Sequence, residues 1–80
     1  MSPPLYRPLT PTERRVARLV SMGYDYARVG ALLGISESTA GVHVGNIAQK
    51  IPNPDHLKPS TLVLLTFAHV RWLEERESAA

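Results

Sequence analysis

The stretch from residue 27 to residue 51, ARVGALLGISESTAGVHVGNIAQKI, restricts the fold of this chain more than any other part of the sequence. Apolar residues recur every three or four positions on both sides of Gly34, which is the spacing of two amphipathic helices. Gly34 is suited to end the first helix, because glycine adopts the left-handed conformation without strain. Ser36 is suited to cap the second helix, because its hydroxyl oxygen accepts a hydrogen bond from an unpaired backbone N–H. The stretch therefore predicts two helices joined by a tight turn at residues 34–36.

The residues before this stretch predict another helix. Thr10 suits the N-cap position, Pro11 the first helical position and Glu13 the third, so that Thr10 and Glu13 complete a capping box. Gly23 is expected to end this helix. Tyr24, which follows, is expected to pack in the joint between this helix and the next.

Further signals define the remaining helices. Asp25 suits the N-cap of the second helix, and Ser60 suits the N-cap of a helix that follows the proline-containing loop beginning at Pro52. Gly30 lies inside the second helix, where it costs up to ~1 kcal/mol relative to alanine, which indicates that another backbone approaches closely there. The predicted fold class is all-α, a four-helix helix-turn-helix domain with helices at about 11–22, 26–33, 37–50 and 61–76.

Length and composition favour one small domain. The chain has 80 residues and no cysteine, so neither a disulfide framework nor a thiolate metal site is expected. The prolines of residues 1–8 predict a loosely held arm, residues 9–76 the domain, and residues 77–80 a frayed tail. The N-terminus has no signal-peptide pattern, and no apolar run approaches the roughly 18 residues that span a bilayer. We therefore expect a cytoplasmic protein without a membrane partner.

The charges are distributed unevenly. Residues 1–58 carry a net charge of +3, whereas residues 59–80 carry −1. The basic excess coincides with the helix-turn-helix part, as binding to a polyanion requires, although an ordinary solvated surface also fits so small an excess.

The sequence contains no pattern that predicts catalysis. It shows no nucleophile–base pair, no phosphate-binding loop and no cluster of metal ligands, and His43 borders an apolar stripe. We expect no enzymatic activity, no cofactor, no metal and no small-molecule ligand.

The predicted helix 61–76 carries two apolar stripes, whereas a surface helix of a small domain buries one. Two stripes indicate full burial or a partner, and a homodimer formed through helix 60–76 fits best. The candidate interface residues are Leu62, Leu65, Phe67, His69, Val70, Trp72 and Leu73.

Three motifs resemble the LuxR-type (GerE/NarL-like) helix-turn-helix domain of bacterial transcription regulators. They are LTPTERRV at 9–16, LGIS at 33–36 and SESTAGVHVGNIAQKI at 36–51. The resemblance implies four helices, with helix 37–50 in the major groove of double-stranded DNA. It also implies that the C-terminal helix, which matches only in position, forms a dimer contact.

The resemblance and the residue types together suggest a set of DNA contacts. Val42 offers an apolar contact to a thymine methyl group, and polar side chains on the same helix offer contacts to bases or phosphates. Arginines on the first two helices offer phosphate contacts. The candidate DNA-binding residues are Thr39, Gly41, Val42, Gly45, Asn46, Gln49, Lys50, Arg14, Arg18 and Arg28.

Two glycines distinguish this chain from the family that it resembles. Members of that family usually have lysine at the position of Gly41 and often a basic or polar residue at Gly45.

The sequence is consistent with three functions, of which a small DNA-binding regulator is the first interpretation. The alternative is a protein-interaction module that binds another transcription protein, in which Gly41 and Gly45 let a partner helix pack closely. A domain like region 4 of a sigma factor is a third interpretation.

Overall fold

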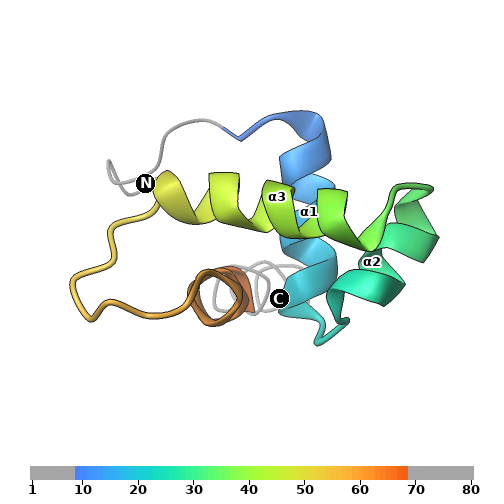
Figure 1. The fold of residues 1–80 in the computed structure, drawn as a ribbon. Coiled ribbons are helices and arrows are strands. Elements are labelled where there is room, and N and C mark those ends of the chain that lie inside the picture. Colours follow the sequence, from blue (N-terminus) through green and yellow to red (C-terminus); the bar gives the residue numbers. More distant parts are fainter. Residues whose placement is uncertain (1–8, 69–80) are drawn as a thin grey trace, which may run out of the picture.

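The structure is a computed structural model that describes residues 9–68, and these residues form helices and no strand (Figure 1). The first three helices are α1, Pro11–Ser21; α2, Tyr26–Leu33; and α3, Glu37–Gln49. A C-terminal helix begins at residue 59, and its described part reaches residue 68. The predicted all-α, four-helix fold is confirmed. The predictions for the arm 1–8, the tail 77–80, His69, Val70, Trp72 and Leu73 lie outside the described residues.

Local hydrogen bonds define the helix starts as the sequence predicted. The Glu13 backbone N–H donates to Thr10 Oγ1 at 3.1 Å, and the Thr10 backbone N–H donates to Glu13 Oε1 at 2.9 Å, which completes the capping box. Asp25 accepts the backbone N–H of Arg28 at 2.8 Å and so caps α2. The prediction for these two N-caps is confirmed.

The turn between α2 and α3 is also built as predicted. Gly34 closes α2 in the left-handed conformation, with φ +71°. Ser36 Oγ accepts the backbone N–H of Thr39 at 3.0 Å and so caps α3. Two helices joined by a left-handed glycine and a capping serine are therefore present in the structure.

Gly30 is the point where the backbone of this turn folds back onto α2. The Ile35 backbone N–H donates to the Gly30 carbonyl at 2.9 Å. A Cβ at Gly30 would lie 2.6 Å from the Ile35 carbonyl oxygen and 3.2 Å from the Ser36 carbonyl carbon. The close backbone approach that the sequence predicted is confirmed.

The start of the C-terminal helix differs from the prediction. The Leu62 backbone N–H donates to the Lys58 carbonyl at 2.9 Å, so the first turn of the helix begins at Pro59. Proline is favoured at the first helical position, where its missing N–H has no helical partner to lose. Ser60 therefore lies inside the first turn, and its predicted role as the N-cap was wrong.

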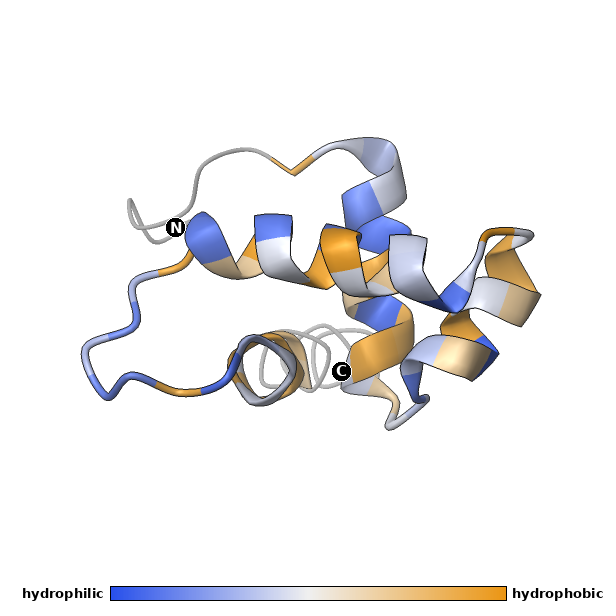
Figure 2. Ribbon diagram, in the orientation of Figure 1, coloured by the Kyte–Doolittle hydropathy of each residue, from blue (hydrophilic) through white to orange (hydrophobic). Residues whose placement is uncertain are grey.

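The core lies where α1 and α2 meet α3 and the C-terminal helix. Along α3, the apolar residues that recur every three or four positions are buried, as their spacing predicts: Ala40, Val44, Ile47 and Ile51. Figure 2 shows hydrophobic and hydrophilic bands alternating along α3. The other buried apolar residues are Val16, Ala17, Val20, Val29, Leu62 and Val63.

The C-terminal helix packs one of its sides against the core. Leu62 is 6 % exposed and Val63 is fully buried. Leu65 is 56 % exposed, while Leu64 and Phe67 pack partly against the core. The core-facing side thus consists of Leu62, Val63, Leu64 and Phe67. Leu62 is not available to a second copy of the chain, and its inclusion in the predicted dimer interface was wrong.

Candidate nucleic-acid interface

The side of α3 opposite the core forms an exposed stripe, here called the outward stripe and defined as Thr39, Val42, Gly45, Asn46 and Gln49. These residues recur at intervals of three or four, which places them on one side of an α-helix. Val42, near the middle, is 60 % exposed, and the side chains of Thr39, Asn46 and Gln49 are also exposed. In Figure 1, α3 lies across the front of α1. The packed residues behind it give α3 a fixed orientation, so the outward stripe presents a defined surface.

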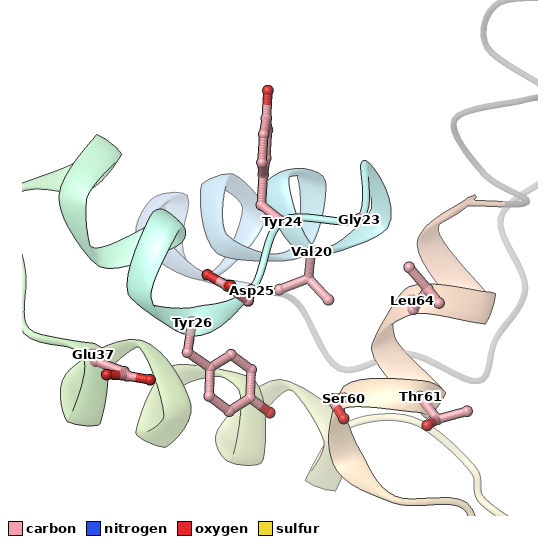
Figure 3. Close-up of a pocket in the computed structure, with 9 residues that line it drawn as sticks. All are labelled: Val20, Gly23, Tyr24, Asp25, Tyr26, Glu37, Ser60, Thr61 and Leu64. Atoms are coloured by element: carbon pink, nitrogen blue, oxygen red, sulfur yellow. The ribbon is translucent and has the colours of Figure 1, made fainter.

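The two glycines of α3 have different surroundings. A Cβ at Gly45 would meet no atom within 4 Å, so this position is open. A Cβ at Gly41 would lie 3.4 Å from two ring carbons of Tyr26, Cδ2 and Cε2. Figure 3 shows the Tyr26 ring pointing from α2 toward α3. Gly45 is therefore open to its surroundings, whereas Gly41 is flanked by the Tyr26 ring.

Substitutions at the two glycines test these surroundings. Gly45→Ala is expected to raise the free energy of unfolding by up to ~1 kcal/mol, because alanine loses less backbone entropy in a helix and meets open space. Gly41→Ala is expected to raise it as well, because its Cβ would make a van der Waals contact with the Tyr26 ring. Chemical denaturation measures both changes. A Gly41→Ala variant that is less stable than the wild type would show that the Tyr26 ring leaves no room for a Cβ at this position.

Lys50, a predicted DNA contact, is held by an ion pair at the end of α3. Its Nζ donates to Glu13 Oε1 at 2.6 Å, with the Lys50 side chain 23 % exposed and that of Glu13 7 % exposed. The same carboxylate oxygen accepts the Thr10 backbone N–H of the capping box. The pair therefore ties the end of α3 to the start of α1. It directs the ammonium toward α1 and fixes the position of the helix that carries the outward stripe.

The hydrogen bond from Lys50 is the main cause that lowers the pKa of Glu13 below its ordinary value of 4.5. The Thr10 backbone N–H acts in the same direction, and burial partly opposes both. Because the pKa is lower in the folded state, the unfolded state takes up the proton first. The stabilisation by this carboxylate is therefore complete above about pH 4.5 and is lost as the pH falls through the lowered folded value.

We expect Glu13→Gln to reduce the free energy of unfolding at pH 7 by ~1 kcal/mol, because the neutral amide still accepts the Thr10 N–H but loses the charge that binds Lys50. The difference from the wild type should shrink as the pH falls below 4.5, where the wild-type carboxylate also becomes neutral. Thermal unfolding between pH 3 and pH 7 measures this difference, with Glu37→Gln at an exposed glutamate as the matched control. A difference that is independent of pH would contradict the assigned charge interaction.

The predicted phosphate contacts lie on the helices that pack against α3. Arg14 and Arg18 are four residues apart on one side of α1, and Arg28 lies in the first turn of α2. All three are exposed. Arg15 is exposed on a different side of α1. The structure thus places guanidinium groups on two helices adjoining the one with the outward stripe.

Sequence reasoning missed a groove between the α1–α2 joint and the C-terminal helix. Its volume is about 450 Å³. Tyr26 lies within it, whereas Tyr24 points away from the other labelled side chains (Figure 3). The prediction that Tyr24 packs in the joint was therefore wrong, because Tyr26 takes that place. The lining residues are Val20, Gly23, Tyr24, Asp25, Tyr26, Glu37, Ser60, Thr61 and Leu64.

Residues 9–68 show neither a membrane-spanning helix nor a metal site. None of the helices described there is both long enough and apolar enough to cross a membrane. Within the same residues, no three His, Asp or Glu side chains gather where they could hold a metal ion.

The left-handed glycine turn, the capped α3 and the exposed outward stripe define a helix-turn-helix domain, a class in which the second helix docks into the DNA major groove. The family of bacterial regulatory proteins, luxR family, matches residues 7–55, more than half of the chain, and the chain belongs to this family. The match includes α1, α2 and α3 and ends before the C-terminal helix. No curated protein and no solved structure matched the sequence.

Proposed function

We propose that this protein is a transcription regulator that binds double-stranded DNA by placing the outward stripe of α3 in the major groove. The observation that carries the proposal is the exposure of this stripe on a helix whose opposite side is completely buried. The major groove of B-DNA admits an α-helix, and base edges are read there. Because α3 is held by the core and by the Glu13–Lys50 pair, its exposed side chains are fixed before DNA binds.

Exposed arginines support the proposal electrostatically. Arg14 and Arg28 are exposed on the two helices that pack against α3, and we infer that they contact phosphates of the bound duplex. Phosphate contacts position a protein on the duplex, and contacts to base edges provide the sequence preference. A regulator of this kind acts in the bacterial cytoplasm, where the chromosome lies.

Salt-dependent binding to fluorescently labelled genomic DNA fragments tests the proposal. We expect binding at low salt and a linear fall of log K with log salt concentration, because each phosphate contact releases counterions. Arg14→Gln and Arg28→Gln should each reduce the slope by about 0.9 if each removes one phosphate contact. Undetectable binding at low salt would refute direct DNA binding and leave a protein-interaction module as the better hypothesis.

We also propose that the regulator is a homodimer formed through helix 60–76. Leu65 supports this proposal, because a large aliphatic side chain on that helix is 56 % exposed. A two-fold dimer would bind two half-sites about one helical turn of DNA apart. In sedimentation, the wild type should have a dimeric mass and Leu65→Lys a monomeric one. A monomeric wild type at high micromolar concentration would contradict this part of the proposal.

A further inference from the structure

We infer that this protein reads mainly A·T base pairs, through the Val42 side chain and the carboxamides of Asn46 and Gln49. The inference rests on the proposed function and specifies the class of DNA sequence that the outward stripe recognises.

The outward stripe contains no charged side chain. In the major groove, guanine presents two acceptors, O6 and N7, which arginine or lysine recognises best. Lys50, which follows Gln49, is held by Glu13 on the α1 side of the helix. The stripe therefore lacks the group that most often selects a G·C pair.

A carboxylate is the other charged group that recognises a G·C pair, since it accepts a hydrogen bond from the cytosine amino group. The only acid of α3 is Glu37, in its first turn. Glu37 lines the groove beside Tyr26 and precedes Gly41 by one helical turn, so it lies toward α2. The stripe thus offers neither of the two charged groups that favour G·C pairs.

The side chains that remain match the major-groove edge of an A·T pair. An asparagine or glutamine carboxamide donates to adenine N7 and accepts from adenine N6, and an aliphatic side chain contacts the thymine methyl group. Val42 is 60 % exposed, and Asn46 and Gln49 are exposed on the same side. The Thr39 hydroxyl already accepts a hydrogen bond from Ser36 Oγ at 2.8 Å, and hydroxyl groups do not select one base pair.

The spacing of these side chains sets the length of the A·T run. Val42 and Gln49 are seven residues apart, which is about 10.5 Å along a helix. Base pairs rise about 3.4 Å each, so the three side chains span roughly three to four base pairs. Gly45 has no side chain, and its Cβ position is open, so the α3 backbone is able to approach the bases closely at this point.

Selection of tight-binding duplexes from a random pool gives the first test. We expect each half-site to contain a run of about three to four A·T pairs. Gly45→Arg, which places a guanidinium in open space on the stripe, should shift the selected sequences toward guanine.

Base analogues in the selected duplex then identify the contacts. Replacing thymine by uracil removes only the methyl group and should weaken wild-type binding about fourfold, whereas Val42→Ala should bind both duplexes equally. Replacing adenine by 7-deazaadenine removes only N7 and should weaken wild-type binding roughly fivefold or more. Asn46→Ala and Gln49→Ala should each reduce this sensitivity, and the double variant should abolish it. Circular dichroism serves as the control for folding. We expect every variant to be folded, because Val42, Asn46 and Gln49 are exposed.

The possible outcomes test the A·T preference separately from the proposed DNA binding on which it rests. Selection of G·C-rich duplexes, or a Val42→Ala variant that remains fully sensitive to uracil, would overturn the A·T inference and leave DNA binding intact. Failure of the wild-type protein to bind any duplex at low salt would overturn both.

Discussion

Gly30→Ala is expected to lower the free energy of unfolding by about 3 kcal/mol, the upper end of the usual overpacking cost. A Cβ at this position would lie 2.6 Å from the Ile35 carbonyl oxygen. That oxygen belongs to the backbone of the turn, which the Ile35–Gly30 hydrogen bond fixes, so it cannot rotate away as a side chain would. A domain of this size has a total stability of roughly 4–12 kcal/mol, so the loss is a large fraction.

Chemical denaturation, compared with Gly45→Ala, tests this expectation. Both variants make the same chemical change in a helical glycine, but the Cβ at Gly45 meets open space. The two changes in unfolding free energy should therefore have opposite signs. A Gly30→Ala variant as stable as the wild type would show that the backbones of α2 and the turn are not in contact at this point.

Val42→Asp is expected to weaken DNA binding by about 100-fold or more while leaving the fold intact. Val42 lies near the middle of the outward stripe and is 60 % exposed, so its replacement leaves no cavity in the core. In the proposed complex, the new carboxylate would be desolvated against phosphates of the same charge, a juxtaposition that costs several kcal/mol. The free energy of unfolding should change by less than ~0.5 kcal/mol, as is usual for surface substitutions. Fluorescence anisotropy measures the binding, and chemical denaturation measures the stability.

Leu32→Asp is the matched control for Val42→Asp. Leu32 is also an exposed aliphatic residue, but it lies on α2 rather than on the outward stripe. The added charge is the same, so any general effect of one more carboxylate appears in both variants. Leu32 lies one helical turn from Arg28, so the added carboxylate is able to offset the proposed phosphate contact of that arginine. We expect Leu32→Asp to bind within about tenfold of the wild type, because only this one phosphate contact is affected and the carboxylate stays hydrated. Equal losses in the two variants would refute a specific contact at Val42.

The sequence predicted those parts of the fold that depend on neighbours in the chain. The capping box of Thr10 and Glu13, the Asp25 cap and the left-handed Gly34 each follow from residues at most four positions apart. The buried stripe of α3 follows from helical periodicity alone. These signals were sufficient for the helix-turn-helix, and even the close backbone approach at Gly30 could be predicted, because its partner is the adjacent turn.

The sequence could not predict contacts between elements that are distant in the chain. The sequence did not show that Lys50 pairs with Glu13, which lies 37 residues earlier and already served as a helix cap. Helical periodicity did not show that the Tyr26 ring of α2 flanks Gly41. The two-stripe pattern of the C-terminal helix likewise did not reveal that Leu62 faces the core of its own chain. In each case, the missing information was the packing angle between two helices.

An NMR titration of the uniformly ¹⁵N-labelled protein with the selected duplex shows directly whether α3 presents the outward stripe to DNA. We expect the largest chemical-shift changes at the backbone amides of Val42, Gly45 and Asn46 and at the side-chain amides of Asn46 and Gln49. The amides of Ser60 and Thr61, which line the protein groove beside the C-terminal helix, should change little. Large changes at Ser60 and Thr61 with an unchanged outward stripe would show that DNA does not bind along α3.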